Sequence, residues 1–456
     1  MTTHTSRRAF LQRASALSIA GSAAPWAVSL AAMGEAAAAT ATDYKALVCV
    51  FLYGGNDYGN TLIPYDNARY TAYQSMRPTL AYAQSALAPT LLVPRVALSG
   101  GIQYAIAPEL SPLLPIFNAG RMGVLLNVGT LVQPTTKAQY LANSVPLPPK
   151  LFSHNDQQSV WQSSSPEGAT SGWGGRMGDL FEASNGNATF TCMNVSSNAV
   201  FLSGKQAVQY QISSSGPVAL TAAKSLFGST TCAAELQRLI TAQSSNLFAN
   251  EYTKVMARSL GAGGQLTTAL AGSKALTTVF PTGNSLADQL KLVARLISTS
   301  NEVGAKRQVF FVSLGGFDNH DGLATIHPGL LTTVADALSA FYAATVELGV
   351  SNQVTSFTAS DFGRTLTAND GSDHGWGSMH FMLGGAVNGG RYFGSAPVVA
   401  NNGADDVGQG RLLPTTSVDQ YAATLGKWFG ISDTDLLTVL PNLVNWNASQ
   451  RNLGFV

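Results

Sequence analysis

The sequence predicts an α/β fold in which a mostly parallel central sheet lies between helices. Three observations lead to this prediction. Short apolar runs recur along the chain, and their length and richness in Val, Leu and Phe are typical of strands buried on both faces. The first and third runs end in a Gly-Gly pair, which lets the backbone turn sharply. Between the third and fourth runs lies a segment with helical periodicity, which predicts a βαβ unit with parallel strands and a right-handed crossover.

The elements are placed in chain order. Four buried strands are expected, at 46–53, 122–128, 309–314 and 354–359. Helices are expected at about 233–260, 285–300, 327–348 and 417–428, the last of them capped by Ser417. Alternating apolar and polar residues at 193–217 indicate short strands or a hairpin. We interpret residues 40–456 as one domain with an insertion at about 180–285.

The first 39 residues predict a twin-arginine signal peptide. An Arg-Arg pair at 7–8 precedes an Ala-rich apolar stretch at about 14–32, and small residues at 36–39 suit signal peptidase. The alternative, a membrane anchor, is disfavoured because glycine, serine and proline interrupt the stretch. We therefore expect the twin-arginine translocase as a partner during export, and a periplasmic or secreted protein that folds, with any cofactor, before it is exported.

Composition narrows the class of protein. Removal of 1–39 deletes three arginines and one glutamate, which takes the formal charge from +1 to −1, so no basic surface for nucleic acid is expected. The mature chain has no other run of eighteen apolar residues, which argues against stable membrane insertion. Three cysteines are too few for a disulfide framework. Cys49 is expected in the core, whereas Cys192 and Cys232 either pair in an oxidising compartment or stay free.

Acidic residues and histidines gather just after three of the predicted strands. Because the carboxyl ends of parallel strands meet at one edge of a sheet, these side chains are expected to share a pocket there. Carboxylates and imidazoles are ligands for hard or borderline divalent ions, so we predict a divalent metal site, with Zn, Mn, Mg and Ca not distinguished. The expected ligands are Asp57, Asp318, His320, Asp361 and His374, with Asn56, Asp373 and His380 as secondary candidates.

Several of these residues have a simpler interpretation. Asn56 and Asp57 alternatively hydrogen-bond their own backbone in a turn. His320 is alternatively an ordinary loop histidine. Arg364, three residues after Asp361, either clamps an oxyanion with two hydrogen bonds or neutralises that carboxylate.

The same residues carry a resemblance to a known family. Over essentially its whole length the mature chain resembles a large bacterial family of twin-arginine-exported proteins of unassigned role, the domain of unknown function 1501 family. The motifs are FLYGGNDYGNTLIPY, LFSHNDQQSVWQ, GWGGRMGDL, GGFDNH, SDFGRT, SDHGWG and TTSVDQYAATLGKWFG. This family in turn resembles the alkaline phosphatase and sulfatase superfamily, which implies a mostly parallel sheet with metal ligands at the strand ends.

The resemblance assigns roles to residues. It implies Asp57 as the first ligand, Asp318 and His320 as a middle pair, and His374 as the final histidine. Asp361 matches the carboxylate of an SDHG-type motif in which Phe362 here stands in place of the histidine, so one-metal and two-metal sites both remain open.

The resemblance also implies a nucleophile at the start of a helix, where backbone amides stabilise an oxyanion. Ser153, with His154 beside it, precedes a helical stretch at 156–162, and Thr61 near Asp57 is a second candidate. A plain capping role for Ser153 is the alternative. The sequence has no Cys-x-Pro-x-Arg motif, which argues against formylglycine sulfatase chemistry.

Two functions are compatible with these residues. The first is an exported metal-dependent hydrolase of small phosphate or sulfate esters, in which the ion offsets charge on the ester with help from Arg364, and Ser153, Thr61 or water attacks. The second is a non-catalytic binding or assembly protein on the same fold with at most a structural metal. The metal content of the purified protein, followed by a panel of chromogenic esters, separates them.

Overall fold

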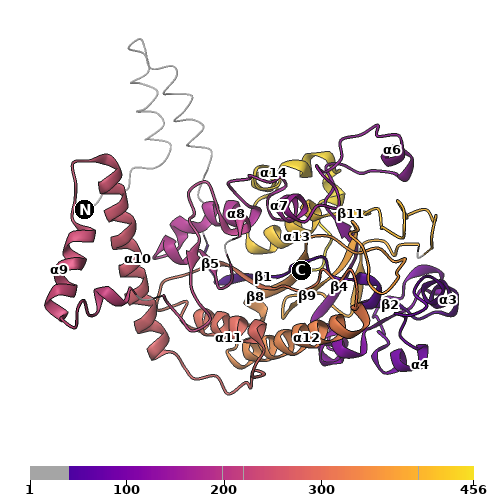
Figure 1. The fold of residues 1–456 in the computed structure, drawn as a ribbon, viewed down its shortest axis with the longest axis horizontal. Coiled ribbons are helices and arrows are strands. Elements are labelled where there is room, and N and C mark those ends of the chain that lie inside the picture. Colours follow the sequence, from indigo (N-terminus) through magenta and orange to yellow (C-terminus); the bar gives the residue numbers. More distant parts are fainter. Residues whose placement is uncertain (1–40, 198, 219, 399) are drawn as a thin grey trace, which may run out of the picture.

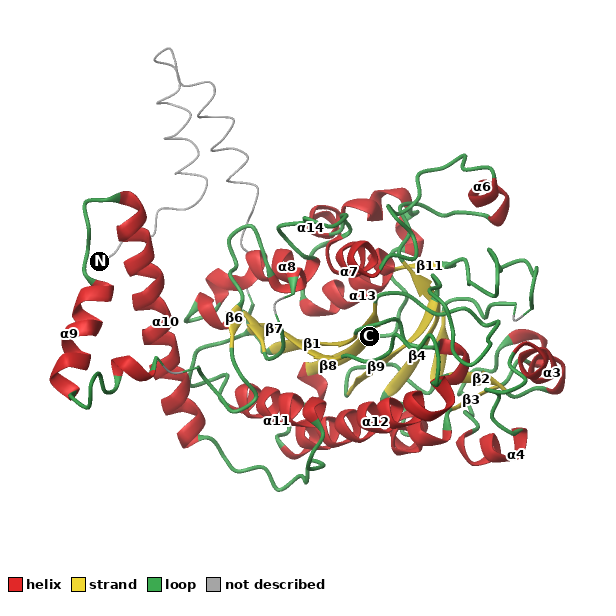
Figure 2. Cartoon of the chain, in the orientation of Figure 1, coloured by secondary structure: helices red, strands yellow, loops and turns green. Residues whose placement is uncertain are grey.

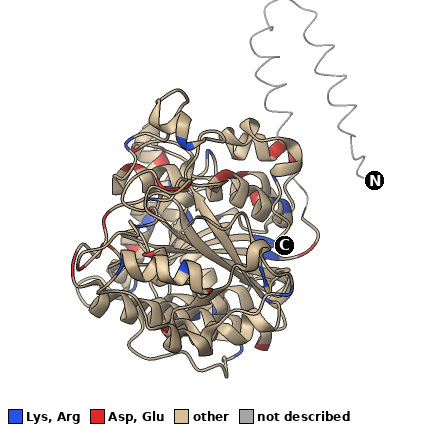
Figure 3. Ribbon diagram, turned by 90° about the vertical axis from the view of Figure 1, so that its right-hand side faces the viewer, with Lys and Arg blue, Asp and Glu red and all other residues tan. Residues whose placement is uncertain are grey.

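The computed structural model describes residues 41–456 apart from 198, 219 and 399. The predicted signal peptide at 1–39 lies outside the described residues. A central sheet crosses the molecule, with helices on both of its faces (Figure 1, Figure 2). Charged residues are sparse and scattered over the ribbon (Figure 3).

The central sheet has nine strands in the order β10-β4-β9-β8-β1-β7-β5-β6, with β11 beside β4. Every pairing is parallel except those of β9, which runs against both β4 and β8. The prediction of a mostly parallel sheet between helices is thus confirmed. The strands are β1 (Lys45–Leu52), β4 (Met122–Gly129), β5 (Cys192–Asn194), β6 (Tyr210–Gln211), β7 (Arg307–Leu314), β8 (Val354–Ser360), β9 (Ser378–Gly384), β10 (Arg391–Phe393) and β11 (Thr416–Ser417).

Strand β1 lies at the centre, between β7 and β8. The predicted parallel pair β7 and β8 therefore does not touch directly, because β1 separates the two strands. Leu52 lies opposite Leu314 on one side and Ser360 on the other, so the three strands end level with one another. The loops that follow them consequently start from one edge of the sheet.

Two layers of helices bury the two faces of the sheet. On one face lie α11 (Ser285–Ser298) and α12 (Leu323–Glu347); on the other lie α7 (His154–Ser163), α8 (Trp173–Phe181), α13 (Val418–Phe429) and α14 (Asp433–Val439) (Figure 1). Alternate residues of β1 enter opposite cores: Val48 and Val50 face the α11–α12 side, and Leu47 and Phe51 the other. Full burial of such a side chain contributes about 1.5–3 kcal/mol.

Helix α12 is the one described helix with the length and composition of a membrane span. Its apolar residues, among them Leu331, Val334 and Leu338, are buried in the core of the α11–α12 side. A core helix has the same composition, so this helix gives no sign of a membrane segment.

The chain also has shorter elements outside these layers. They are α3 (Asn67–Met76), α4 (Gln84–Leu87), α5 (Leu114–Asn118), α6 (Lys137–Leu141) and an antiparallel pair, β2 (Leu62–Pro64) with β3 (Tyr104–Ile106).

The predicted insertion at about 180–285 divides into two parts. Of the two alternatives predicted for 193–217, the structure has the short strands and not the hairpin, because β5 and β6 extend the central sheet in parallel. The expected helix at 233–260 is two helices, α9 (Thr230–Thr241) and α10 (Leu247–Gly272), which project from the body as a helical hairpin (Figure 1). Polar residues at 243–246, including the Asn246 cap of α10, separate them.

The three cysteines are unpaired. Cys49 is buried in β1, as predicted. Cys192 is buried in β5, whereas Cys232 is exposed on α9, so the possible Cys192–Cys232 bridge is not formed. One thiol lies inside the sheet core and the other on the projecting hairpin, which explains why they do not meet.

Candidate metal centre

The loops after β1, β7 and β8 meet at the carboxyl edge of the sheet. Gly54 has a φ of +114°, and a Cβ added to it would lie 2.4 Å from the backbone nitrogen of Asp318. Only glycine allows this approach of the first loop to the second. The loop after β8 carries Asp361 at its start and His374 further along, and α7 directs its first residue, His154, toward the same place.

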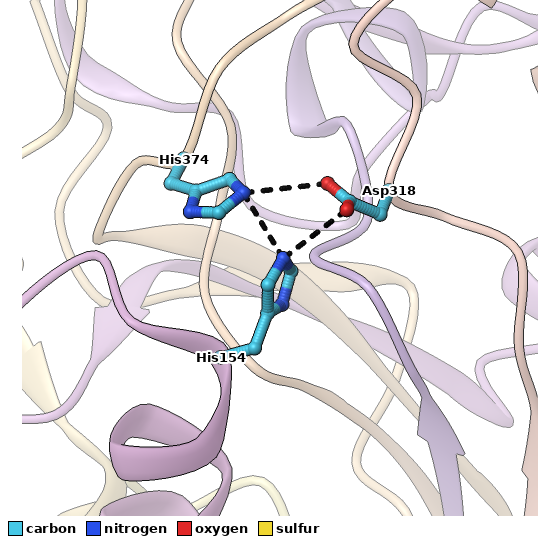
Figure 4. Close-up of side chains that lie close together, drawn as sticks. All are labelled: His154, Asp318 and His374. Atoms are coloured by element: carbon cyan, nitrogen blue, oxygen red, sulfur yellow. Dashed lines mark hydrogen bonds and ion pairs between the residues drawn. The ribbon is translucent and has the colours of Figure 1, made fainter.

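Three side chains converge at this edge: His154, Asp318 and His374 (Figure 4). The Nε2 atoms of the two histidines lie 3.0 Å apart, and the two Asp318 oxygens lie 3.4 Å from His154 and His374 respectively. Ligands around a tetrahedral ion with bonds of about 2.0–2.2 Å are separated by about 3.4 Å. One atom from each residue therefore suits a shared metal ion.

The second ring nitrogen of each histidine is already occupied. Nδ1 of His374 donates to the carbonyl oxygen of Phe152 at 2.6 Å, and Nδ1 of His154 lies 2.6 Å from Oδ2 of Asp361. A carbonyl only accepts, so a neutral His374 carries its proton on Nδ1 and presents the Nε2 lone pair to the cluster. Such outer hydrogen bonds are typical of histidines that bind metals.

His320 brings a third imidazole to the cluster. Its Nε2 lies 2.9 Å from Nε2 of His374 and 3.0 Å from Oδ1 of Asp318, while its Nδ1 lies 3.1 Å from Asp373. Two imidazoles thus approach the single lone pair of His374, which can accept only one hydrogen bond. A cation among these nitrogens would satisfy all of them. The chemistry of the donor atoms therefore fits a metal.

The pKa shifts of Asp318 and His374 favour the protonation states that bind a cation. Burial opposes ionisation of Asp318, but Arg364 and the histidines outweigh it and hold the pKa of this carboxyl below its usual value. Burial lowers the pKa of His374, and the nearby charge of His154 lowers it further. The hydrogen bond to the Phe152 carbonyl raises it but is outweighed, so the neutral form of His374 is favoured. For His154 burial is outweighed by the Asp361 hydrogen bond and the two aspartates, and its pKa is raised. A metal must displace that proton, so its binding weakens as the pH falls.

Partial exposure gives the cluster access to solvent. The side chains of His154 and His374 are 24% and 25% exposed, and that of Asp318 is 44% exposed. Behind them, the Phe362 ring packs against both imidazoles, with centroid distances of 4.8 and 4.9 Å. The site therefore has an apolar inner wall and an open outer side, as catalytic rather than closed structural sites do.

Asp361 lies behind His154 rather than among the converging atoms, which corrects its prediction as a direct ligand. Its Oδ2 accepts hydrogen bonds from Gln158 and the Gly54 amide at 2.8 and 3.2 Å, in addition to the His154 contact. Its Oδ1 is buried and has no hydrogen-bond partner among the described residues. Because the histidine ring separates it from the cluster, Asp361 positions His154.

Arg364 is fully buried and pairs with Asp318, not with Asp361. Nη1 donates to Asp318 at 2.6 Å and to the Gly54 carbonyl at 3.0 Å. The remaining nitrogens face Ser372: Nη2 donates to its carbonyl and Nε to its hydroxyl. Arg364 therefore fixes the Asp318 carboxylate, and each of its nitrogens is already engaged.

Asp57 does not join the cluster, which corrects its assignment as the first ligand. Both of its oxygens accept hydrogen bonds from the buried guanidinium of Arg77, at 2.8 and 2.7 Å. Asp57 also caps the short helix that starts at Tyr58. Asn56 and Thr61 hydrogen-bond each other at 3.0 Å and are buried beside it. The Thr61 hydroxyl donates to the Asp57 carbonyl, so Thr61 does not stand ready as a nucleophile.

The remaining candidates occupy different places. Asp373 supports His320 from outside the cluster. His380 lies on β9, buried against Trp161 and hydrogen-bonded to Thr358, and is not part of the site. The hydroxyl of Ser153 donates to Asp156 at 3.0 Å and makes no capping bond to the backbone of α7.

Sequence reasoning missed three contributors. Gln158 holds Asp361, one turn after His154 on α7. Phe152 presents its carbonyl to His374 from a left-handed backbone with φ +73°, which is strained for a bulky residue. Arg411 donates from Nε to the His374 carbonyl at 2.7 Å. Of these, only Gln158 had a sequence signal, its helical spacing from His154.

Replacement of Asp361 by Asn is expected to weaken metal binding roughly 10–100-fold while the protein stays folded. The amide keeps the shape of the carboxylate but removes the charge that holds the His154 ring. A chelator competition titration measures the affinity, with Asp321→Asn, an exposed carboxylate of the loop after β7, as control. Equal affinities for Asp361→Asn and the wild type would refute this role.

The buried histidines predict acid sensitivity. Burial lowers the pKa of His380 to about 3 and that of His327 to about 4, from 6.5. The unfolded chain binds these protons below about pH 6.5 and the folded chain does not, so stability is complete above that pH and declines as the pH falls. Each of the two histidines should lower the free energy of unfolding by about 2 kcal/mol at pH 5 relative to pH 7. Urea unfolding at pH 7 and 5 tests this: His380→Phe should remove its share of the loss, and an unchanged pH dependence would contradict it.

Comparisons place the chain among known proteins. A family model described as "Protein of unknown function (DUF1501)" matches residues 44–440. No curated protein sequence matches the chain. The structure is similar to PsFucS1 sulfatase from Pseudoalteromonas sp., at 10% identity and a TM-score of 0.33, with 86% of this chain and 68% of that chain covered.

Two further solved structures are similar over most of their length. One is the alkaline phosphatase from the Antarctic bacterium TAB5, at 11% identity and a TM-score of 0.31, covering 88% of this chain and 99% of that chain. The other is Ps i-CgsB in complex with k-i-k-neocarrahexaose, at 10% identity and 0.35, covering 89% and 77%. The family model that matches is thus the one that the motifs indicated.

Proposed function

Because this chain belongs to the DUF1501 family of proteins of unknown function, its activity is inferred from its site, and we propose that it is an exported, metal-dependent hydrolase of phosphate or sulfate esters. The observation that carries the proposal is the convergence of His154, Asp318 and His374 with the outer nitrogen of each histidine already fixed. Export is supported by the Arg-Arg pair at 7–8, and recovery of the native protein only from cytoplasmic fractions would contradict it.

His154, Asp318 and His374 would hold the ion, with His320 within reach. When bound, a divalent ion would polarise the ester oxygens and offset the negative charge that develops on them. A set of imidazoles with one carboxylate favours a borderline ion such as zinc over magnesium or calcium, which prefer oxygen ligands.

The chain's own residues orient the candidate ligands and stabilise a negative charge at the cluster. Arg364 holds Asp318, and Asp361 and the Phe152 carbonyl hold the two histidines, so the ligands need little reorganisation. His154 is the first residue of α7, whose N-terminal amides and dipole favour a negative charge nearby. An ester anion at the cluster would therefore face favourable potential from two directions.

Ser153 is the nucleophile that we favour, because it adjoins His154 and its hydroxyl donates to the carboxylate of Asp156, which can accept its proton, whereas the Thr61 hydroxyl donates to a backbone carbonyl. Ser153→Ala is expected to keep the metal and to lower turnover about 10³-fold or more, since a covalent step would be lost. Turnover of chromogenic phosphate and sulfate esters by the metal-loaded protein measures this.

The control for this experiment is Ser159→Ala, another serine of α7, whose hydroxyl donates to the Pro166 carbonyl. Wild-type turnover in Ser153→Ala would contradict the nucleophile assignment and leave water to attack. A wild-type protein that binds metal but hydrolyses no ester would support the second function, a binding or assembly protein with a structural metal.

A further inference from the structure

An anionic ester at the cluster needs positively charged donors, and the predicted donor is not free to act. Arg364 is fully buried, and its nitrogens are engaged by Asp318, the Gly54 carbonyl and Ser372. An oxyanion would have to displace Asp318 to reach it. The guanidinium that recognises a substrate must therefore come from elsewhere.

Arg411 is tied to both sides of His374. Its Nε donates to the His374 carbonyl at 2.7 Å, and its guanidinium lies over the Phe152 ring, with Cζ 5.0 Å from the centroid. Phe152 is the residue whose carbonyl accepts the His374 Nδ1 proton. These contacts hold the guanidinium beside the two loops that deliver the histidines.

No carboxylate in the described part of the chain neutralises the charge of Arg411. The side chain is only partly buried, and among the described residues it forms no ion pair with a carboxylate. Among the described residues, the guanidinium makes one further hydrogen bond, a long one of 3.4 Å from Nη1 to the Gly408 carbonyl, and Nη2 makes none. An oriented guanidinium with free N–H groups is suited to bind a tetrahedral oxyanion.

We propose that Arg411 is a specificity-determining residue that binds an anionic oxygen of the substrate, an inference that rests on the proposed hydrolase function. The substrate class is a monoester with a free tetrahedral oxyanion, phosphate or sulfate. One anionic oxygen of its phosphate or sulfate group binds Arg411 while the same group lies at the cluster. Stacking on Phe152 keeps the guanidinium in place without neutralising it.

The test measures anion binding to the full mature, zinc-loaded protein. Calorimetry with orthophosphate and with sulfate identifies the preferred anion. Arg411→Gln is expected to weaken its binding roughly tenfold to hundredfold, because charge-assisted hydrogen bonds are lost. Arg411→Lys should lose less, because it keeps the charge. Zinc affinity should be unchanged in both variants, since Arg411 contacts the His374 backbone and the Phe152 ring and not the ligand atoms of His154, Asp318 or His374.

The matched control is Arg295→Gln. Arg295 is also partly buried and also donates to a backbone carbonyl, that of Leu270, but it lies on α11 across the sheet. Anion affinity equal to wild type in Arg411→Gln, or an equal loss in Arg295→Gln, overturns the assignment.

The two possible failures are distinguishable. If the wild type binds zinc and the anion but Arg411→Gln binds the anion equally well, only the role of Arg411 falls. If the wild type binds no zinc, or binds zinc but neither anion, the proposed function is refuted, and the role of Arg411 is refuted with it. Thermal unfolding of each variant establishes that the protein measured is folded.

Discussion

Replacing His374 by alanine is expected to remove the bound metal and all ester hydrolysis together. Nε2 of His374 contacts every other member of the cluster: it lies 3.4 Å from Asp318, 3.0 Å from His154 and 2.9 Å from His320. Loss of this nitrogen should reduce metal affinity by more than the roughly 10–100-fold expected when an outer residue is changed. Metal analysis after dialysis and ester turnover measure the two effects.

The control is Thr367→Ala, an exposed residue of the same loop whose hydroxyl donates to Asn401 and to no other described residue. It should keep both metal and activity. A His374→Ala protein that retains stoichiometric metal and unchanged hydrolysis would make the histidines ordinary loop residues.

The largest effect on stability is expected from Arg77→Leu. Arg77 and Asp57 are both buried and joined by two hydrogen bonds, and Arg77 also donates to the Thr365 and Leu366 carbonyls. Removing the guanidinium leaves a buried carboxylate without its partner, which typically costs about 3–5 kcal/mol. Urea unfolding measures the loss.

The matched control is Arg69→Leu, which breaks a less buried pair with Asp66 and should cost no more than about 1 kcal/mol. Asp57→Asn completes the test, because it should destabilise the protein without changing metal affinity. A weakened metal affinity in folded Asp57→Asn would restore Asp57 as a ligand and contradict the arrangement described here.

Much of the fold follows from local sequence pattern. The apolar runs that become β1, β4, β7 and β8 are buried on both faces, and such strands are recognisable because no polar residue interrupts them for long. Parallel strands that end level bring their loops together, so the meeting of Asp318 with His374 also follows from the topology. Local pattern does not distinguish strand from helix at β9, because its antiparallel pairing depends on neighbours far away in the chain.

The partners of the charged groups do not follow from pattern. Asp57 and Asp318 both come shortly after a Gly-Gly pair, yet Asp57 pairs with Arg77 from the end of α3 and Asp318 with Arg364. Sequence gives the same signal for both, and only tertiary packing distinguishes them. The sequence predicts His154 only as a neighbour of the nucleophile, but the direction of α7 brings its ring into the cluster. On the inner side, His154 contacts Asp361 and Phe362, the phenylalanine that replaces the expected histidine.

Whether this cluster binds one metal ion is decided by the metal content and X-ray absorption spectrum of the mature protein after zinc loading and extensive dialysis. We expect one zinc per chain, with imidazole nitrogens from at least two histidines and one carboxylate oxygen among the bound atoms, because His154, His374 and Asp318 converge there. A protein that retains less than stoichiometric zinc, or one whose spectrum shows no imidazole bound to the ion, would refute a metal centre at this edge of the sheet.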